Sequence, residues 1–112
     1  MRLMCSSATN HQILVYSLSG EFLRAHGTPG FREAGQLTEP HICDVDSKGS
    51  VLVADRGNHR LQIMSKEGHF SVLHLEPQVL TPGSAVILDG TLYVTSVGSC
   101  PKMCKYMYTS SC

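Results

Sequence analysis

The stretch that decides the fold is VLVADRGNHRLQIMSKEGHF, residues 51–70. It holds two runs rich in Val, Ile and Leu, and a turn with Gly follows each run. Such runs predict short β-strands, and such turns predict hairpins. Between the runs lies the segment Asp55–Arg60, whose carboxylate, imidazole and guanidinium groups suit either acid–base chemistry or a tight turn.

The composition predicts a globular chain. With 112 residues, 42% hydrophobic and 16% charged, it has the size and make-up of one modest domain. Nine basic and nine acidic residues cancel, so no whole-chain charge attracts nucleic acid or an anionic membrane. No apolar run reaches the roughly 18 residues that a membrane helix needs, and the first ten residues lack the apolar core of a secretory signal. We therefore expect no membrane partner.

The cysteines predict a reducing compartment. Their count is odd, at five, and Cys5 and Cys43 lie inside apolar strand-like runs. Reduced thiols in a cytoplasmic protein explain this better than a disulfide framework. Cys100, Cys104 and Cys112 lack the C-x2-C spacing of a zinc knuckle. We expect no metal and no cofactor.

Internal repetition is the most informative feature of the chain. An offset of 48 residues places Asn10-His11 over Asn58-His59, Ser17 over Ser65, Gly20 over Gly68 and Phe22 over Phe70. An offset of 41 places residues 90–96 over residues 49–55. Periods of about 40–50 residues are typical of β-propeller blades and of some helical arrays. Since no segment shows a sustained 3.6-residue apolar period, we expect almost no helix.

Six runs rich in β-branched and aromatic residues predict strands: 41–45, 50–54, 59–65, 69–75, 84–88 and 91–96. Asp89-Gly90 predicts a two-residue type I′ hairpin turn. The run VLVA is apolar on both faces, as expected for a sheet that lies between two others. These features predict an all-β fold, a partial β-propeller of about two and a half four-stranded antiparallel blades.

The Gly- and Pro-containing segments predict connections between blades. Residues 26–40 would join the outer strand of one blade to the inner strand of the next, with Leu37 as the buried anchor. Residues 76–83 would make the equivalent link to the third unit.

GTPGFREAGQLTEP (27–40) followed by CDVDSKGSVLVADRGNHRLQIMSKEGHF (43–70) resembles the NHL repeat, which is named after an Asn-His-Leu motif. Here the motif reads Asn58-His59-Arg60-Leu61. The resemblance is specific over about 27–75 and weaker over 2–26. It implies three units: a partial NHL blade over 1–26, a complete NHL repeat over 27–75 and a partial, degenerate last blade over 76–112.

The tail is similar to the last blade of NHL propellers in tripartite-motif ubiquitin ligases, where Lys102–Tyr106 would be the third strand. Those ligases carry RING, B-box and coiled-coil segments before the propeller. A family propeller closes with about six blades, so the resemblance implies that the remaining blades lie on a longer parent chain. Without neighbours the outer sheets would expose large apolar patches. We expect the isolated chain to be aggregated or molten.

The charged segment predicts a structural turn. Asp55 and Arg60 would face each other across the hairpin as a structural turn pair. Gly57 and Asn58 would take positive φ at its tip. Arg56 and His59 would then remain to reach a ligand.

Catalytic motifs are absent from the sequence. It has no nucleophile elbow, no H-E-x-x-H motif and no Walker glycine loop, so we expect no catalytic residues. A related propeller, the peptidyl-hydroxyglycine lyase, holds a metal with histidines from several blades, which makes a lyase-like enzyme one alternative. His11 and His59 belong to the repeat signature, however, and we expect no metal there.

The loops between blades emerge on one rim of a propeller. We expect this rim to be locally basic and to bind a partner through Asn10, His11, His26, Arg32, Arg56, Asn58 and His59. In the family such a face binds substrate proteins or single-stranded RNA. RNA needs stacking aromatics beside the cations, and only Phe31 lies next to Arg32. We therefore favour a protein substrate, in a propeller that serves a RING-type ubiquitin ligase. The alternative is an RNA-binding NHL propeller of a translational repressor.

Overall fold

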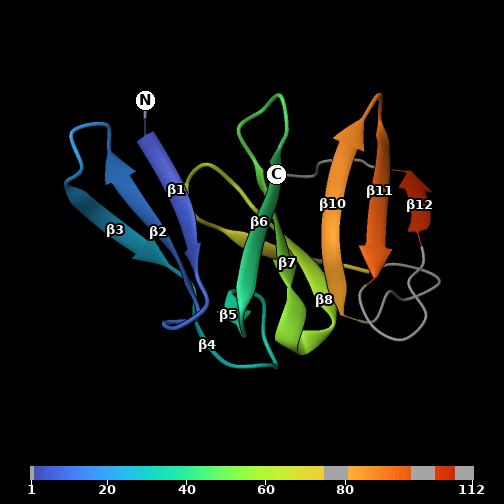
Figure 1. Ribbon diagram of the computed structural model, residues 1–112, viewed down its shortest axis with the longest axis horizontal. Coiled ribbons are helices and arrows are strands. Elements are labelled where there is room, and N and C mark those ends of the chain that lie inside the picture. Colours follow the sequence, from blue (N-terminus) through green and yellow to red (C-terminus); the bar gives the residue numbers. More distant parts are fainter. Residues whose placement is uncertain (1, 75–80, 97–102, 108–112) are drawn as a thin grey trace.

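The computed structural model describes residues 2–74, 81–96 and 103–107. Three antiparallel sheets lie in a row along the long axis of the molecule (Figure 1). The first sheet contains β1 (Arg2–Ser7), β2 (Gln12–Ser17) and β3 (Phe22–His26). The central sheet contains β6 (Pro40–Val45), β7 (Val51–Asp55), β8 (Arg60–Met64) and β9 (Phe70–Leu73). The third sheet contains β10 (Pro82–Leu88), β11 (Thr91–Ser96) and β12 (Met103–Met107).

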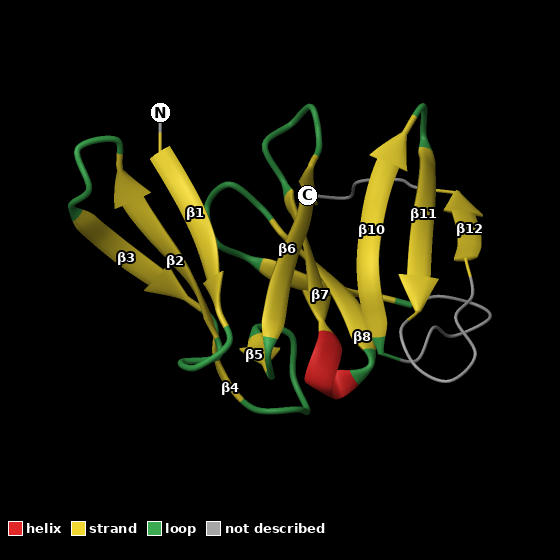
Figure 2. Cartoon of the chain, viewed as in Figure 1, coloured by secondary structure: helices red, strands yellow, loops and turns green. Residues whose placement is uncertain are grey.

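The predicted fold class is confirmed. The six predicted strands correspond to β6–β11, and β12 lies where the resemblance placed a third strand. Within the described ranges the helical structure consists of the single 3-10 turn η1 (Arg56–Asn58), drawn in red in Figure 2. No helix in this described part is long and apolar enough to cross a membrane.

The turns show the same repetition as the sequence. After β2 the hydroxyl of Ser17 accepts a hydrogen bond from the amide of Glu21 at 3.1 Å. After β8 the hydroxyl of Ser65 accepts one from the amide of His69, also at 3.1 Å. The predicted type I′ turn is confirmed, because both of its central residues have positive φ, 50° at Asp89 and 76° at Gly90.

Two apolar layers fill the spaces between the three sheets. Successive side chains of a strand point to opposite faces, so β7 contributes Val51 and Val53 to one layer and Leu52 and Ala54 to the other. The layer against the first sheet contains Ile13, Leu37, Val51, Val53 and Met64. The layer against the third sheet contains Leu52, Ala54, Leu61, Ile63, Ala85, Leu92 and Val94. This arrangement explains why β7 is apolar on both faces.

The connection over 26–40 is more ordered than a simple loop. It contains a short parallel pair, β4 (Thr28–Pro29) and β5 (Gln36–Leu37). Leu37 is fully buried, which confirms it as the anchor. Gly27 allows this packing, since a Cβ there would lie only 2.7 Å from Cδ1 of Leu37. Most of the predicted link over 76–83, along with Cys100, Lys102 and Cys112, lies outside the described residues.

Candidate functional site

Asp55, the last residue of β7, is completely buried and holds four hydrogen bonds. Its Oδ1 accepts from the amide of Thr38 at 2.7 Å. Its Oδ2 accepts from Nε of Arg60 at 2.7 Å, from Nδ2 of Asn58 at 2.9 Å and from Nε2 of Gln62 at 3.1 Å. A buried carboxylate is costly unless it is paired and hydrogen-bonded. These four donors compensate that cost, and they also occupy the carboxylate.

Arg60 extends the network to the loop that precedes β5. Its Nη2 donates to the carbonyls of Glu33 at 2.9 Å and Gln36 at 2.7 Å. Its Nε is already paired with Asp55. The guanidinium therefore bridges the end of β7 and the segment 30–36, which we call the Gly30–Gln36 loop.

Two amide side chains complete this support. Gln62 donates from Nε2 to the carbonyl of Gln36 at 2.9 Å and accepts at Oε1 from the amide of Gly35 at 3.0 Å. Asn58 donates from Nδ2 to the carbonyl of Gly30 at 2.8 Å. Because these partners lie 24–28 residues apart in sequence, the network fixes the Gly30–Gln36 loop against the central sheet.

The loop also stabilises its own backbone. Oε1 of Gln36 accepts from the amides of Arg32 at 2.9 Å and Glu33 at 2.8 Å. Gly30 has φ 156°, and a Cβ there would lie 2.6 Å from Cδ of Gln36. The side chain of Gln36 thus fills the inside of the loop.

The prediction of positive φ at Gly57 and Asn58 is wrong. These residues belong to η1, and the left-handed residue is His59, with φ 55° and ψ 44°. A glycine is needed at position 57 for another reason, because the backbone there lies very close to Thr38. Its amide donates to the carbonyl of Thr38 at 2.9 Å, and a Cβ would lie 2.4 Å from Cγ2 of Thr38.

The signature histidines connect each sheet to the next. Nδ1 of His11 accepts from the amide of Glu39 at 3.0 Å, and Nδ1 of His59 accepts from the amide of Thr81 at 2.9 Å. Both donors have positive φ, 51° and 47°, and a proline follows each of them. The two contacts are equivalent, and each holds the backbone as it enters a new sheet. In the part of the chain that the structure describes, no group of three or more His, Cys, Asp or Glu residues could hold a metal ion.

The structure brings part of the predicted rim together. Asn58 contacts the loop that carries Arg32, and Arg56 and His59 lie within or next to η1. His11 joins this end of the molecule through its contact with Glu39, and Asn10 precedes it in the β1–β2 turn.

The backbone of His26 pairs with Ile13 near this end of β2, but its ring has a different neighbour. Its ring packs against Gly68, where a Cβ would lie 2.5 Å from Cε1. Gly68 is in the β8–β9 turn, at the opposite end of β8 from η1. Burial, and then the charges of Arg24 and Arg2, hold the pKa of His26 below its usual value.

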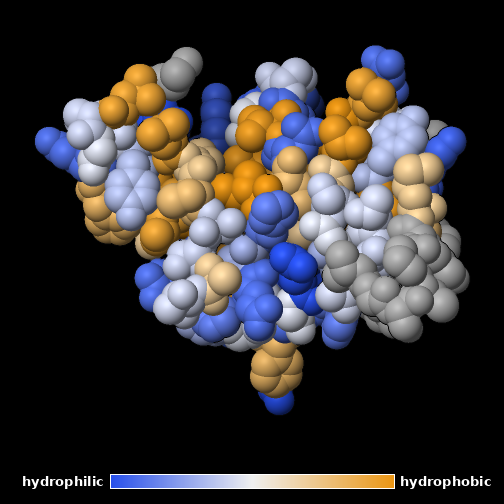
Figure 3. Space-filling model, in the orientation of Figure 1, coloured by the Kyte–Doolittle hydropathy of each residue, from blue (hydrophilic) through white to orange (hydrophobic). Residues whose placement is uncertain are grey.

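The accessible groups of this surface include an aromatic ring, arginine side chains and the exposed Glu33. Phe31 is 69% exposed, and the guanidinium of Arg32 lies 5.6 Å from the centre of its ring. Arg56 is half-buried and His59 is exposed. Figure 3 shows hydrophilic side chains over the lower centre of the molecule, where Figures 1 and 2 place β5 and η1.

Thr38, Gln36 and Gln62 were missed by the sequence analysis although they support the loop. Gln62 had a usable signal, because it is a polar residue inside the apolar run RLQIM. Its complete burial makes hydrogen-bond partners necessary. Gln36 and Thr38 have no comparable signal, since polar residues are ordinary in a loop.

Comparison with known proteins identifies the repeat. Residues 37–64 match the family model of the NHL repeat. The B-box type zinc finger protein ncl-1 of Caenorhabditis elegans is 50% identical over 36 residues, which are 32% of this chain and 4% of that protein. Protein brain tumor of Drosophila melanogaster is 50% identical over 68 residues, 54% of this chain and 7% of that protein.

The human E3 ubiquitin-protein ligase TRIM32 is 38% identical over 56 residues, 50% of this chain and 8% of that protein. The chain thus spans less than a tenth of the length of each of these relatives. The matched segment runs from the anchor Leu37 through β7 and η1 to the end of β8. Residues 37–64 of this chain therefore contain an NHL repeat, which includes the hairpin that carries Asn58-His59-Arg60-Leu61.

Proposed function

We propose that this chain is a protein-interaction module and that the surface formed by η1 and the Gly30–Gln36 loop docks a protein substrate for a RING-type ubiquitin ligase. The proposal rests on one observation: at this surface, buried side chains support the loop and other side chains are exposed on it. The fully buried Gln62 bonds the loop directly, and the fully buried Asp55 pairs with Arg60, which bonds the loop carbonyls. Phe31 and Arg32 remain exposed on the loop.

The network favours docking over catalysis. The carboxylate of Asp55 already accepts four hydrogen bonds, and Arg60 already bridges it to the loop carbonyls. A general acid or base needs a free proton-transfer site within reach of a substrate, and this pair offers none. A loop fixed before binding loses less entropy when its partner arrives.

The exposed residue types suit a protein partner. Aromatic residues, including Phe, and arginine are enriched at protein–protein interfaces. Phe31 and Arg32 provide one aromatic residue and one arginine on a loop whose backbone is held by hydrogen bonds. The ligase role is supported by the similarity to TRIM32, which is named an E3 ubiquitin-protein ligase.

Single-stranded RNA is the second candidate. The pairing of Arg32 with the ring of Phe31 also resembles the stacking platforms that bind single strands. Arg56 would add a phosphate contact. The neutral net charge of the chain weighs against this candidate, because RNA affinity depends strongly on phosphate neutralisation.

Site-specific cross-linking in cells tests the proposal. A photo-activatable residue is placed at position 31 on the loop, or at position 48 in the β6–β7 turn, at the opposite end of β7. We expect a protein cross-linked from position 31 and not from position 48. Once that protein is identified and purified, the double variant Arg32→Ala plus Arg56→Ala should bind it at least 10-fold more weakly, and Lys48→Ala should bind it normally. Loss of its ubiquitylation in cells that express the double variant would support the ligase role.

Two results would overturn the proposal. Equal affinity of the double variant and the wild-type chain would remove the surface from consideration. A position-31 cross-link that ribonuclease abolishes would favour RNA instead, particularly if affinity for a random single-stranded RNA pool falls steeply with salt.

A further inference from the structure

The outer face of the first sheet is apolar, and no other sheet among the described residues covers it. Leu3, Cys5, Tyr16 and Phe22 share this face, because Leu3 pairs with Tyr16 and Tyr16 pairs with Phe22 across the strands. Leu3 is 53% exposed and Phe22 is 58% exposed. The rings of Tyr16 and Phe22 meet edge to face, with their centres 5.8 Å apart.

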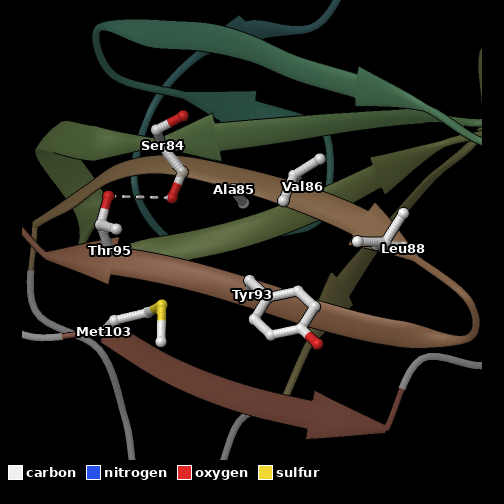
Figure 4. Close-up of a pocket in the computed structure, with 7 residues that line it drawn as sticks. All are labelled: Ser84, Ala85, Val86, Leu88, Tyr93, Thr95 and Met103. Atoms are coloured by element: carbon white, nitrogen blue, oxygen red, sulfur yellow. Dashed lines mark hydrogen bonds between the residues drawn. The ribbon is translucent and has the colours of Figure 1, made fainter.

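The outer face of the third sheet is also largely apolar, and the ammonium of Lys105 lies 5.7 Å from the centre of the Tyr93 ring on it. Val86 and Leu88 on β10, Tyr93 on β11 and Met103 on β12 line a shallow hollow of about 310 Å³ (Figure 4). Val86, Leu88 and Met103 are each about half exposed or more, at 48%, 58% and 59%. Alternate residues of the same strands face the central sheet and are covered. Large exposed apolar faces of this kind mark interaction surfaces.

The repeat shows what kind of surface the first sheet presents. With the offset of 48 residues, its outer face corresponds to one face of the central sheet: Leu3 to Val51, Cys5 to Val53, Tyr16 to Met64 and Phe22 to Phe70. Those four central residues pack in the layer against the first sheet. The outer face of the first sheet is therefore built to pack against a preceding sheet.

The third sheet presents the complementary surface. With the offset of 41 residues, Tyr93 corresponds to Leu52 and Thr95 to Ala54. Leu52 and Ala54 belong to the face of the central sheet that the third sheet covers. Met103 pairs with Thr95 just as Leu61 pairs with Ala54. The outer face of the third sheet is therefore built to accept a following sheet.

We propose that a second copy of this chain packs the outer face of its first sheet on the outer face of the third sheet, so that copies associate head to tail. The contact would continue the two sheet-to-sheet interfaces that already exist within one chain. Each copy carries both complementary faces, so the chain needs no other partner to extend the stack. A heterologous contact of this type produces a closed ring or an open filament, depending on the rotation between copies. The proposal concerns the sheet faces and is independent of the function proposed for the loop surface.

Single-face variants of the full chain test this proposal in reducing buffer. Leu3→Glu places a charge on the first outer face, and Val86→Glu places one on the third. Both positions are about half exposed, so the carboxylate can reach water in the monomer. Sedimentation velocity at micromolar concentration should show a discrete oligomer for the wild-type chain and a monomer for each variant alone.

Mixing the two variants gives the sharpest result. Leu3→Glu retains an intact third face, and Val86→Glu retains an intact first face, so one contact can form. We expect a 1:1 dimer with a strand-type circular dichroism spectrum, even if each variant is poorly folded alone. Lys48→Glu, which introduces the same side chain in an exposed turn, should associate like the wild-type chain.

Cys5 gives an independent readout, because it is exposed on the first outer face. Its alkylation rate should fall several-fold as the wild-type concentration rises, while the rate at the half-buried Cys43 stays constant. A monomeric wild-type chain would overturn the proposal and would leave further sheets of a longer protein as the occupants. Aggregation that neither glutamate variant reduces, or a mixture that forms no dimer, would overturn it as well.

Discussion

Arg60 donates a hydrogen bond from Nε to Oδ2 of Asp55 across 2.7 Å, and Asp55 is completely buried. The same guanidinium reaches the carbonyls of Glu33 and Gln36, so one side chain joins the hairpin end to the Gly30–Gln36 loop. The charged segment of the sequence is therefore a scaffold. Asp55 and Arg60 pair with each other inside it, and Phe31 and Arg32 are exposed on the loop that the pair supports.

Replacing Asp55 with Asn removes the charge while keeping the shape. The amide nitrogen would face the donors of Arg60 and Gln62, and the guanidinium would lose its counter-ion. Breaking a buried ion pair from one side costs about 3–5 kcal/mol. We expect a large fall in the urea midpoint of unfolding, measured at a fixed protein concentration.

Asp89→Asn is the matched control for this substitution. Asp89 lies exposed in the β10–β11 turn with φ 50°, a conformation that Asn accepts readily. The free energy of unfolding of this variant should lie within about 0.5 kcal/mol of the wild-type value. Similar midpoints for the Asp55 and Asp89 variants would show that the buried pair contributes nothing to stability.

Gly57→Ala should destabilise the chain by overpacking. A Cβ at this position would lie 2.4 Å from Cγ2 and 3.0 Å from the carbonyl oxygen of Thr38. Overpacking of this kind typically costs about 1–3 kcal/mol. Thr38→Ser removes Cγ2 and keeps the hydroxyl that donates to Gly30, so the double variant should recover part of the loss. Urea unfolding of the wild-type chain, the two single variants and the double variant gives the coupling free energy between the two positions. Purely additive changes in the free energy of unfolding would argue against the contact.

His59→Ala should release the start of the third sheet. The variant removes the acceptor for the amide of Thr81 and leaves a residue without local side-chain support at φ 55°. We expect hydrogen exchange at the Thr81 amide to accelerate at least several-fold. His69→Ala, in the exposed turn before β9, is the control and should leave that amide unchanged. An unchanged exchange rate in the His59 variant would refute the link between sheets.

The pH dependence of the free energy of unfolding should reflect protonation of the His26 imidazole. Burial and the charges of Arg24 and Arg2 lower the pKa of its imidazole in the folded chain below the ordinary value of 6.5. The unfolded chain therefore binds more protons between the folded pKa and about 6.5, so stability falls as the pH is lowered through this window. His26→Gln should make the urea midpoint less sensitive to pH between about 7.5 and 5.5, and Arg24→Gln should do so to a smaller degree. A steeper decline in His26→Gln than in the wild-type chain would contradict this assignment.

Local signals in the sequence predicted the fold well. The strands follow from short β-branched runs, and the turn at Asp89-Gly90 follows from the tolerance of both residues for positive φ. The buried anchor at Leu37 also follows from its being a large apolar residue in a polar connection. Each of these features depends on residues that are close together in the sequence.

The site depends on distant residues, and there the sequence was less informative. Positive φ was expected at Gly57 and Asn58, yet His59 takes it because its Nδ1 gains a bond to Thr81, 22 residues away. The same limitation applies to His26, whose ring packs on Gly68, a contact that the sequence did not predict. A side chain's long-range partner decided its place in both cases.

The central claim is that the hydrogen-bond network around Asp55 fixes the Gly30–Gln36 loop and the residues that follow it, and hydrogen exchange of the Gly35 and Thr38 amides tests this claim most directly. The amide of Gly35 donates to Oε1 of Gln62, and the amide of Thr38 donates to Oδ1 of Asp55. We predict that both amides exchange slowly in the wild-type chain and lose their protection in Asp55→Ala, while the amide of Ser50, bonded to Asp46 at the opposite end of β7, stays protected. Fast exchange at Gly35 and Thr38 in the wild-type chain would contradict the claim.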